Sequence, residues 1–188
     1  MSTAVLMQRI AETSPRLKAR IAGVFYLLTI VMGAAALFVH GRLGFAVDLI
    51  ATVCYIGVTA LFYDLFKPVN KTLSLLAASF NIIGLTIGRL DLHPRGEDIE
   101  LVFVGLYCLL IGYLIFRSTF LPRVLGILMA FAGLGWLTSL SPALTNYLTP
   151  YNLAPGILGT GSLTLWLLVF GVDAQRWKER ASAAGEWQ

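Results

Sequence analysis

The chain has 188 residues, of which 57% are apolar and only 13% are charged, and its formal net charge is +4. Soluble domains carry roughly 25% charged residues, so this composition excludes an ordinary water-soluble domain. The small basic excess is explained by membrane topology and does not indicate binding to nucleic acid.

Six long apolar stretches divide the chain. A hydrocarbon core about 30 Å thick requires about 20 apolar residues in a helix. Strands of a membrane barrel alternate apolar and polar residues over about 10 positions, whereas the first and fourth stretches are apolar on every side. We therefore predict an all-α, polytopic transmembrane bundle with six spans, at Ile21–His40, Phe45–Phe66, Leu73–Leu90, Ile99–Phe116, Val124–Leu140 and Leu153–Val172.

A basic leader, residues 1–20, precedes the first span. Ser14-Pro15 has the form of an N-cap followed by proline at the first helical position, so we expect a helix to begin there and to continue into the span. The leader is longer than the n-region of a usual signal peptide and five more spans follow, which favours an uncleaved first helix. The transmembrane domain is then 21–172, and the cytoplasmic tail, 173–188, is expected to be a short helical extension.

The first three spans carry polar residues, and not merely small ones, at helical spacing. The second span has Asp48, Thr52 and Tyr55 on one face, and the third has Asn81 near the middle of the membrane, where an amide needs hydrogen-bond partners. Because polar and small side chains face neighbouring helices in a bilayer, the pattern predicts a polar seam between the first three helices.

Asp48 is the most informative residue, because it lies a few positions inside an otherwise apolar span. A charge at the bilayer centre costs about 2.5–3.5 kcal/mol on insertion scales, so such a residue normally faces the bundle interior and has a partner. The partners expected at the same level are His40, Arg42, Arg89 and His93. Two interpretations stay open: a structural ion pair or protonated carboxylate, and a site for a ligand, a proton or an ion.

The connection between the third and fourth spans concentrates titratable groups. Histidine and carboxylate side chains bind divalent cations, but their spacing here matches no metal signature. A solvated loop with mutual ion pairs is the alternative. We find no P-loop, dinucleotide fingerprint or nucleophile elbow, and we predict neither a cofactor nor a metal site nor a catalytic residue. The candidate ligand-binding or polar-seam residues are Asp48, His93, Glu97, Asp98, Arg89, Asn81, Tyr55 and Thr52.

The basic residues are distributed unevenly among the connections. Eleven of the fourteen lie in alternate connections counted from the N-terminus, and the other set contains only Arg42, Arg89 and Arg95. Cytoplasmic loops carry an excess of lysine and arginine, so this distribution predicts that both termini are cytoplasmic and that the number of spans is even.

Three groups of segments resemble a bacterial membrane family, the domain of unknown function 4386. They are Arg20–Gly33, then Asp48–Asn70, and then His93–Gly96 with Leu101–Gly105, Gly112–Arg117 and Phe120–Gly126. The resemblance implies a small multi-pass protein of the bacterial inner membrane and supplies no reaction. It also implies that this chain is shortened between its third and fourth helices, and that the family pattern includes positions matching Asp48 and His93.

Three functions are compatible with these features. The first is a non-enzymatic accessory or scaffold subunit of a membrane complex, because the chain is small, has short loops and lacks a catalytic signature. The second is a transporter or binding protein for a small molecule or ion that uses Asp48 and the polar seam; a water-accessible cavity reaching Asp48 would favour it. The third is a membrane-embedded enzyme with an outer-face site made of His93 and Glu97 or Asp98. The expected partners are the lipid bilayer and other membrane subunits or further copies of the chain.

Overall fold

The structure is a computed structural model that describes residues 14–36, 38–90, 99–148, 151 and 153–185. Within these ranges the ordered elements are all helices, which confirms the predicted all-α class, and no strand occurs among them. The helices are α2 (Pro15–Ala36), α3 (Gly41–Phe66), α4 (Lys71–Arg89), α5 (Ile99–Arg117), α6 (Arg123–Leu137), the 3-10 turn η2 (Thr138–Leu140), α7 (Pro142–Leu148), α8 (Leu153–Val169) and α9 (Ala174–Ala183).

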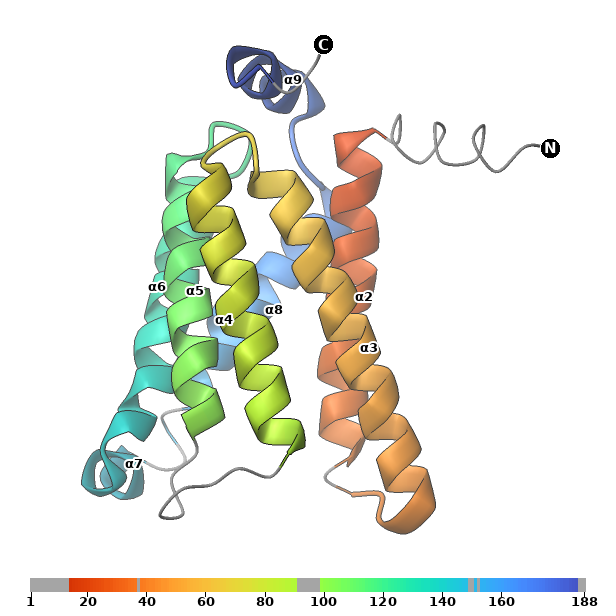
Figure 1. Ribbon diagram of the computed structural model, residues 1–188, viewed down its shortest axis with the longest axis vertical. Helices are drawn as coiled ribbons and strands as arrows, with labels where there is room; N and C mark the ends of the chain where they lie inside the picture. The colour runs from red at the N-terminus through yellow and green to blue at the C-terminus, as the bar shows by residue number, and fades with distance from the viewer. Residues whose placement is uncertain (1–13, 37, 91–98, 149–150, 152, 186–188) are drawn as a thin grey trace, which may run out of the picture.

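The long helices run side by side, whereas α7 and α9 lie at opposite ends of the bundle (Figure 1). α2, α3, α4, α5 and the stretch Arg123–Leu140 are each long and apolar enough to cross a membrane. α8 meets this criterion only together with α9, and the two helices are bent by 102° relative to each other. The described residues therefore contain five to six candidate spans. We call the two ends of the bundle the α9 end and the α7 end.

The flanks of the bundle are covered by large apolar side chains. Phe45 and Val53 of α3, Leu134 of α6 and Leu165 of α8 are all exposed on the protein surface. A soluble protein rarely exposes so much apolar surface, whereas a helix that contacts lipid must do so. The exposed flanks therefore agree with the apolar spans predicted from the sequence.

Side-chain caps explain where two helices begin at the α9 end. The Ser14 hydroxyl oxygen accepts a hydrogen bond from the backbone N–H of Leu17 at 3.3 Å, and α2 begins at the next residue, as the sequence predicts. After Pro68 has ended α3, Asn70 Oδ1 accepts from the backbone N–H of Leu73 at 3.0 Å and caps α4. The leader and the first span thus form one helix from Pro15, and residues 1–13 lie outside the described residues.

The tail contains a short helix, α9, which does not continue α8 in a straight line. α8 ends at Val169, and Gly171 follows with a φ of 69°, a backbone conformation that favours glycine. The N–H of Gly171 donates to the Trp166 carbonyl at 3.1 Å. α9 then leaves at a steep angle and lies across the end of the bundle (Figure 1). The buried Trp177 fixes it there, because its Nε1–H donates to the Leu65 carbonyl of α3 at 2.8 Å.

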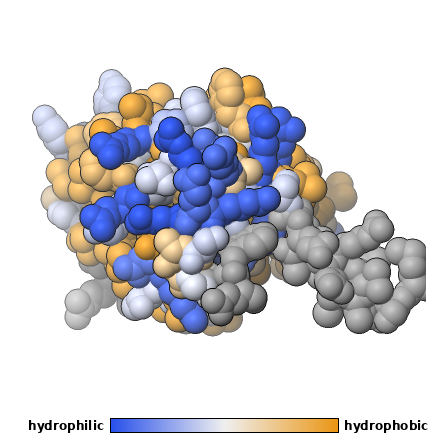
Figure 2. Space-filling model, turned by 90° about the horizontal axis from the view of Figure 1, so that it is seen from above, coloured by the Kyte–Doolittle hydropathy of each residue, from blue (hydrophilic) through white to orange (hydrophobic). Residues whose placement is uncertain are grey.

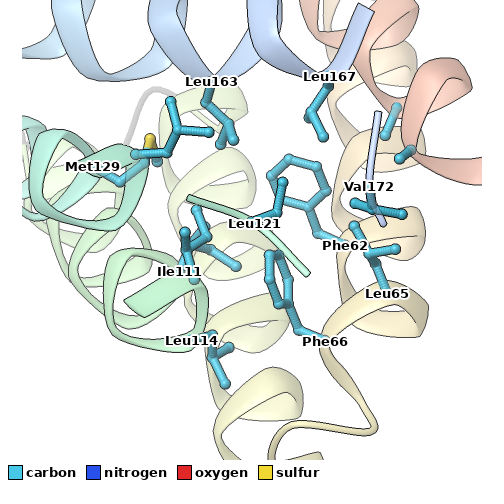
Figure 3. Packing of buried hydrophobic residues seen from close by; sticks show 14 of the residues in the cluster. Phe62, Leu65, Phe66, Ile111, Leu114, Leu121, Met129, Leu163, Leu167 and Val172 are labelled. Carbon is cyan, nitrogen blue, oxygen red and sulfur yellow. The ribbon is translucent and has the colours of Figure 1, made fainter. Parts of the chain in front are cut away.

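The apolar core fills the half of the bundle nearer to α9. Phe62 and Phe66 of α3, Leu114 of α5, Met129 of α6 and Leu167 of α8 are all buried in one cluster. Figure 3 shows these side chains converging from their different helices. The other half, towards α7, is less completely filled, and it contains the candidate site.

Glycines set the distance between α5 and α6. A Cβ atom at Gly112 would lie 2.7 Å from the Gly126 carbonyl oxygen and 2.8 Å from the Ala130 nitrogen. A Cβ atom at Gly133 would similarly lie 2.8 Å from the Gly105 carbonyl oxygen. Two backbones that approach this closely leave no room for a side chain, which is the usual role of small residues between membrane helices.

Candidate ligand-binding pocket

A pocket of about 300 Å³ lies between α2, α3, α4 and α5 in the α7 half of the bundle. This volume is at the lower end of the range of about 300–1,000 Å³ that small-molecule sites occupy. The pocket collects polar side chains from all four helices, although these helices are otherwise apolar. Its polar lining residues are Thr29, Asp48, Thr52, Tyr55, Arg89 and Glu100.

Asp48 and Arg89 form an ion pair at this pocket. Arg89, the last residue of α4, donates from Nη1 to Asp48 Oδ2 and from Nη2 to the Asp48 backbone oxygen at 2.7 Å. Of the expected partners that the structure describes, His40, Arg42 and Arg89, it is Arg89 that makes the contact, whereas His93 lies outside the described residues. The two side chains keep 33% and 45% of their exposure, so the pair is a partly open one and not a buried salt bridge.

One face of α3 continues the polar lining away from Asp48. Thr52 and Tyr55 follow Asp48 at helical spacing, and Thr52 Oγ1 donates to the Asp48 backbone oxygen at 3.0 Å. On α2, Thr29 Oγ1 donates to the Phe25 backbone oxygen at 2.9 Å. Because both threonine hydroxyls give their hydrogens to the backbone, their oxygens face a ligand as acceptors.

Tyr55 connects the pocket with an aromatic cluster deeper in the bundle. Its ring stacks on that of Tyr26 at a centroid distance of 5.9 Å and meets the edge of the Tyr107 ring at 6.2 Å. Tyr26 and Tyr107 are buried, and their hydroxyl groups have no hydrogen-bond partner within the described residues. These tyrosines separate the pocket from the apolar core.

Asn81 lies next to the pocket, on its α9 side, and is not part of the lining. It is fully buried in α4, and its Nδ2 donates to the Thr59 hydroxyl oxygen of α3. Thr59 in turn donates to the Tyr55 backbone oxygen at 2.8 Å. Among the described residues the Asn81 Oδ1 atom has no hydrogen-bond partner. Asn81 therefore links α4 to α3 about one helical turn from the pocket, on its α9 side.

Two glycines of α4 allow α5 to approach the pocket. A Cβ atom at Gly84 would lie 3.0 Å from the Phe103 Cβ atom and 3.1 Å from the Glu100 backbone oxygen, and Gly88 faces the Glu100 side chain. This close approach brings Glu100 into the lining. Glu100 is the second residue of the predicted span Ile99–Phe116. The sequence gives no reason to select it, because α5 is apolar on nearly every side and has no polar stripe that would predict which face turns towards the pocket.

The structure brings together four of the eight candidate residues, namely Asp48, Thr52, Tyr55 and Arg89. Asn81 lies next to them, whereas His93, Glu97 and Asp98 fall in 91–98, outside the described residues. In the part of the chain that the structure describes, no group of three or more histidine, cysteine or carboxylate side chains could hold a metal ion. The two cysteines, Cys54 and Cys108, are free thiols inside helices.

These features define a small, all-helical protein with transmembrane helices and a polar pocket between four of them. The sequence model of the domain of unknown function DUF4386 matches residues 40–89 and 85–171, and the chain belongs to this family. The two matched ranges meet at the end of α4, next to the connection where we expect the chain to be shortened. The segment Arg20–Gly33, which also suggested the resemblance, lies outside the matched ranges.

The chain is also similar to a protein from an archaeon. The chain is 24% identical over 124 residues to an uncharacterized protein of Archaeoglobus fulgidus, and the match covers 62% of this chain and 76% of the relative. No solved structure matches the chain. Neither the family nor the archaeal relative is described with a substrate or a partner.

Proposed function

We propose that this protein binds a small molecule carrying a protonated amine in the pocket between α2, α3, α4 and α5, as a transporter or a binding protein of the membrane. The observation that carries the proposal is the pocket of about 300 Å³ in which Asp48, Arg89, Thr52 and Tyr55 meet. A cavity at Asp48 is the feature that separates a ligand-binding role from the accessory-subunit role.

Apart from Arg89, whose guanidinium is paired with Asp48, the polar groups of the lining favour a ligand that donates hydrogen bonds. The carboxylates of the lining, Asp48 and Glu100, accept only, and the oxygens of Thr29 and Thr52 are left as acceptors by their bonds to the backbone. The aromatic ring of Tyr55 adds a face that attracts cations. Charge-assisted hydrogen bonds from an ammonium group to a carboxylate are the strongest that such a lining offers.

We further propose six spans in the inner membrane, with both termini in the cytoplasm and α8 as the sixth span. α8 has 17 residues and is therefore about 26 Å long, close to the thickness of the hydrocarbon core. Hydrophilic residues gather at the α9 end, which Figure 2 shows from above. Because basic residues concentrate at this end, it would face the cytoplasm and the pocket would open towards the outer side.

The two other functions stay predictions. Apolar flanks are what an accessory subunit would use to contact a partner, but lipid contact requires the same surface. The enzyme hypothesis depends on His93, Glu97 and Asp98, which lie outside the described residues. No contact in the described part of the chain favours either function over ligand binding.

A matched pair of aspartates on α3 tests the proposal. Asp48 lines the pocket, whereas Asp64 lies at the opposite end of α3 and pairs with Lys18 Nζ at 2.5 Å. Purified protein is heated in mild detergent with a panel of small alkylamines and amino acids, and with the carboxylates of the same carbon skeletons. A ligand present at about 100 times its Kd stabilises the folded state by roughly 2.7 kcal/mol, which is a measurable rise in Tm.

We expect a subset of the amines to raise the Tm of the wild type and of Asp64→Asn, and to have little effect on Asp48→Asn. The carboxylates should give a smaller rise, because Arg89, the cation of the lining, is already paired with Asp48. If every amine that stabilises the wild type also stabilises Asp48→Asn equally, ligand binding at this pocket is wrong.

A further inference from the structure

A second hollow, of about 680 Å³, lies at the α9 end of the bundle. Its walls are the first turn of α2, the connection between α5 and α6, the end of α8 and the start of α9. It is separate from the ligand pocket, which lies in the α7 half. The residues that matter for its chemistry are Arg16, Thr119, Trp166, Phe170, Asp173 and Arg176.

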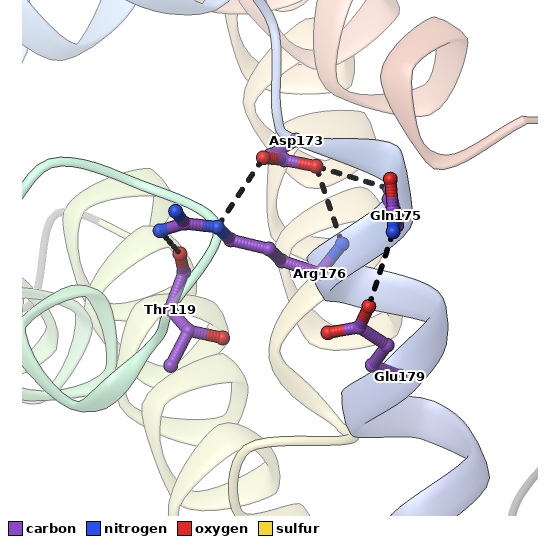
Figure 4. Close-up of polar contacts among 5 residues, drawn as sticks. All are labelled: Thr119, Asp173, Gln175, Arg176 and Glu179. Atoms are coloured by element: carbon purple, nitrogen blue, oxygen red, sulfur yellow. Dashed lines mark hydrogen bonds and ion pairs between the residues drawn. The ribbon is translucent and has the colours of Figure 1, made fainter.

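Two arginines from opposite ends of the chain line this hollow. Arg176 donates from Nη1 to the Thr119 backbone oxygen at 3.2 Å and pairs through Nε with Asp173 Oδ2 at 3.5 Å, as Figure 4 shows. Arg16 donates from Nε to the Phe170 backbone oxygen at 3.3 Å. A guanidinium has five N–H donors, so these contacts within the described residues leave donors on both arginines for a ligand.

The charge around the hollow is positive. Arg20, one helical turn from Arg16, donates from Nη2 to the Val169 backbone oxygen at 3.3 Å and so lies at the same end of α8. The carboxylate at this site, Asp173, is already engaged: Oδ1 caps α9 and Oδ2 pairs with Arg176. Three guanidinium groups around one carboxylate favour an anion, and forked guanidinium donors suit phosphate oxygens in particular.

The hollow also has an apolar wall, formed by two aromatic residues at the end of α8. The rings of Trp166 and Phe170 lie 4.4 Å apart, and Phe170 is 54% exposed on the flank of the bundle. A free phosphate has no apolar group that could pack against these rings, whereas a hydrocarbon chain attached to the phosphate would lie against them. The combination of arginines and aromatic rings therefore fits a phospholipid better than a free anion.

α9 places this combination at the depth of the lipid headgroups. The helix runs across the end of the bundle, with Trp177 buried against α3 and with Arg176, Lys178 and Arg180 on its other faces. A short amphipathic helix in this orientation is typical of a membrane interface. Basic pockets between transmembrane helices on the cytoplasmic side bind acidic lipid headgroups.

We propose that the hollow at the α9 end is a binding site for an anionic phospholipid, with its phosphate held by Arg16 and Arg176 and one acyl chain against Trp166 and Phe170. This site is independent of the ligand proposed for the pocket in the α7 half. It gives the steep turn between α8 and α9 a role, because a straight continuation of α8 would not bring Arg176 to Arg16.

The test uses the full chain purified in a neutral, mild detergent. Dioleoyl phosphatidylglycerol is added in parallel with dioleoyl phosphatidylcholine and with soluble glycerol phosphate, and retained lipid is counted by native mass spectrometry alongside the Tm. The variants are Arg176→Gln and Arg16→Gln. Lys71→Gln is the matched control, because Lys71 is an exposed cation at the same end of the bundle and outside the hollow.

We expect phosphatidylglycerol to be retained by the wild type and by Lys71→Gln, and its affinity to fall roughly tenfold for each arginine that is removed. Arg16→Gln also loses a hydrogen bond to the Phe170 backbone oxygen, so it could lower the Tm even without lipid. In that case the result of Arg176→Gln decides the test. Equal retention of phosphatidylcholine, equal stabilisation by glycerol phosphate, or an unchanged affinity in Arg176→Gln would each overturn the proposal.

Discussion

The two halves of the bundle are built from the same helices but hold them together differently. In the α9 half, α3, α5, α6 and α8 meet through buried apolar side chains such as Phe62, Leu114 and Leu167. In the α7 half, α3 reaches α4 through the partly exposed pair of Asp48 and Arg89, and a pocket remains between them. The α9 half contains the apolar cluster, whereas the α7 half contains the pocket between α2, α3, α4 and α5.

The three tyrosines mark the boundary between these halves. Tyr26 and Tyr107 are buried with the core, whereas Tyr55 lies between them and the pocket. The partly exposed ion pair lies at the pocket, whereas the large apolar side chains of the cluster lie on the other side of these tyrosines. We therefore expect the loss in the free energy of unfolding on substitution to differ between the apolar cluster and the pocket.

The largest effect is expected for Phe62→Ala in the α9 half. Phe62 is 1% exposed, and its ring meets those of Tyr26 and Phe66 at 5.9 and 5.8 Å. Truncating a buried phenylalanine costs roughly 3–5 kcal/mol in protein cores, and because the contact and cavity parts of this cost remain in a bilayer we expect about 3 kcal/mol. The measurement is reversible unfolding in mixed micelles, followed by circular dichroism.

Phe45→Ala is the control for this prediction, since Phe45 is on the same helix but is 67% exposed on the flank. It should leave the free energy of unfolding nearly unchanged. A similar loss for the two variants would mean that the apolar cluster does not hold the bundle together.

The next effect compares one glycine from each half. In Gly112→Ala the new Cβ atom would meet backbone atoms of α6 at 2.7 and 2.8 Å, so the two helices must separate, and we expect a loss of about 1–3 kcal/mol. Gly33 lines the pocket, and a Cβ atom there has nothing within 4 Å. Gly33→Ala should be neutral or slightly stabilising, because alanine favours a helix by roughly 0.5–1 kcal/mol over glycine.

The same unfolding assay measures both variants. If Gly33→Ala were as destabilising as Gly112→Ala, the space beside Gly33 would not be the open pocket that the structure shows. A selective loss of amine binding in Gly33→Ala, without loss of stability, would instead support the pocket.

Much of the fold could be predicted from the sequence because the bilayer imposes a strong length rule. The window Leu153–Val172 begins where α8 begins, and Phe45–Phe66 ends where α3 ends. The polar stripe of α3 was also visible, since Asp48, Thr52 and Tyr55 recur at helical spacing and the structure puts all three in one pocket.

The rest depended on tertiary contacts that spacing does not encode. The sequence offered two histidines and two arginines at the level of Asp48, and the placement of α4 beside α3 brings Arg89 to it. Glu100 joins the pocket through the rotation of α5, which has no polar stripe to reveal it. The turn between α8 and α9 depends on Gly171 and on the distant contact of Trp177 with Leu65, so the tail could not be placed from its own sequence.

The smallest effect on stability is expected for the pair of aspartates on α3, and this is what makes them informative. The side chains of Asp48 and Asp64 are equally exposed, each at 45%, and each pairs with one cation of a neighbouring helix. Partly exposed ion pairs contribute about 0–1 kcal/mol, so Asp48→Asn and Asp64→Asn should both lower the free energy of unfolding by less than about 1 kcal/mol, and by similar amounts.

High salt should reduce both losses further, since screening weakens exposed pairs. A matched cost in stability with a loss of amine binding only in Asp48→Asn would assign the difference to the pocket. A much larger loss of stability for Asp48→Asn would instead mean that Asp48 holds the α7 half together, and its presence in the pocket would then no longer indicate a ligand.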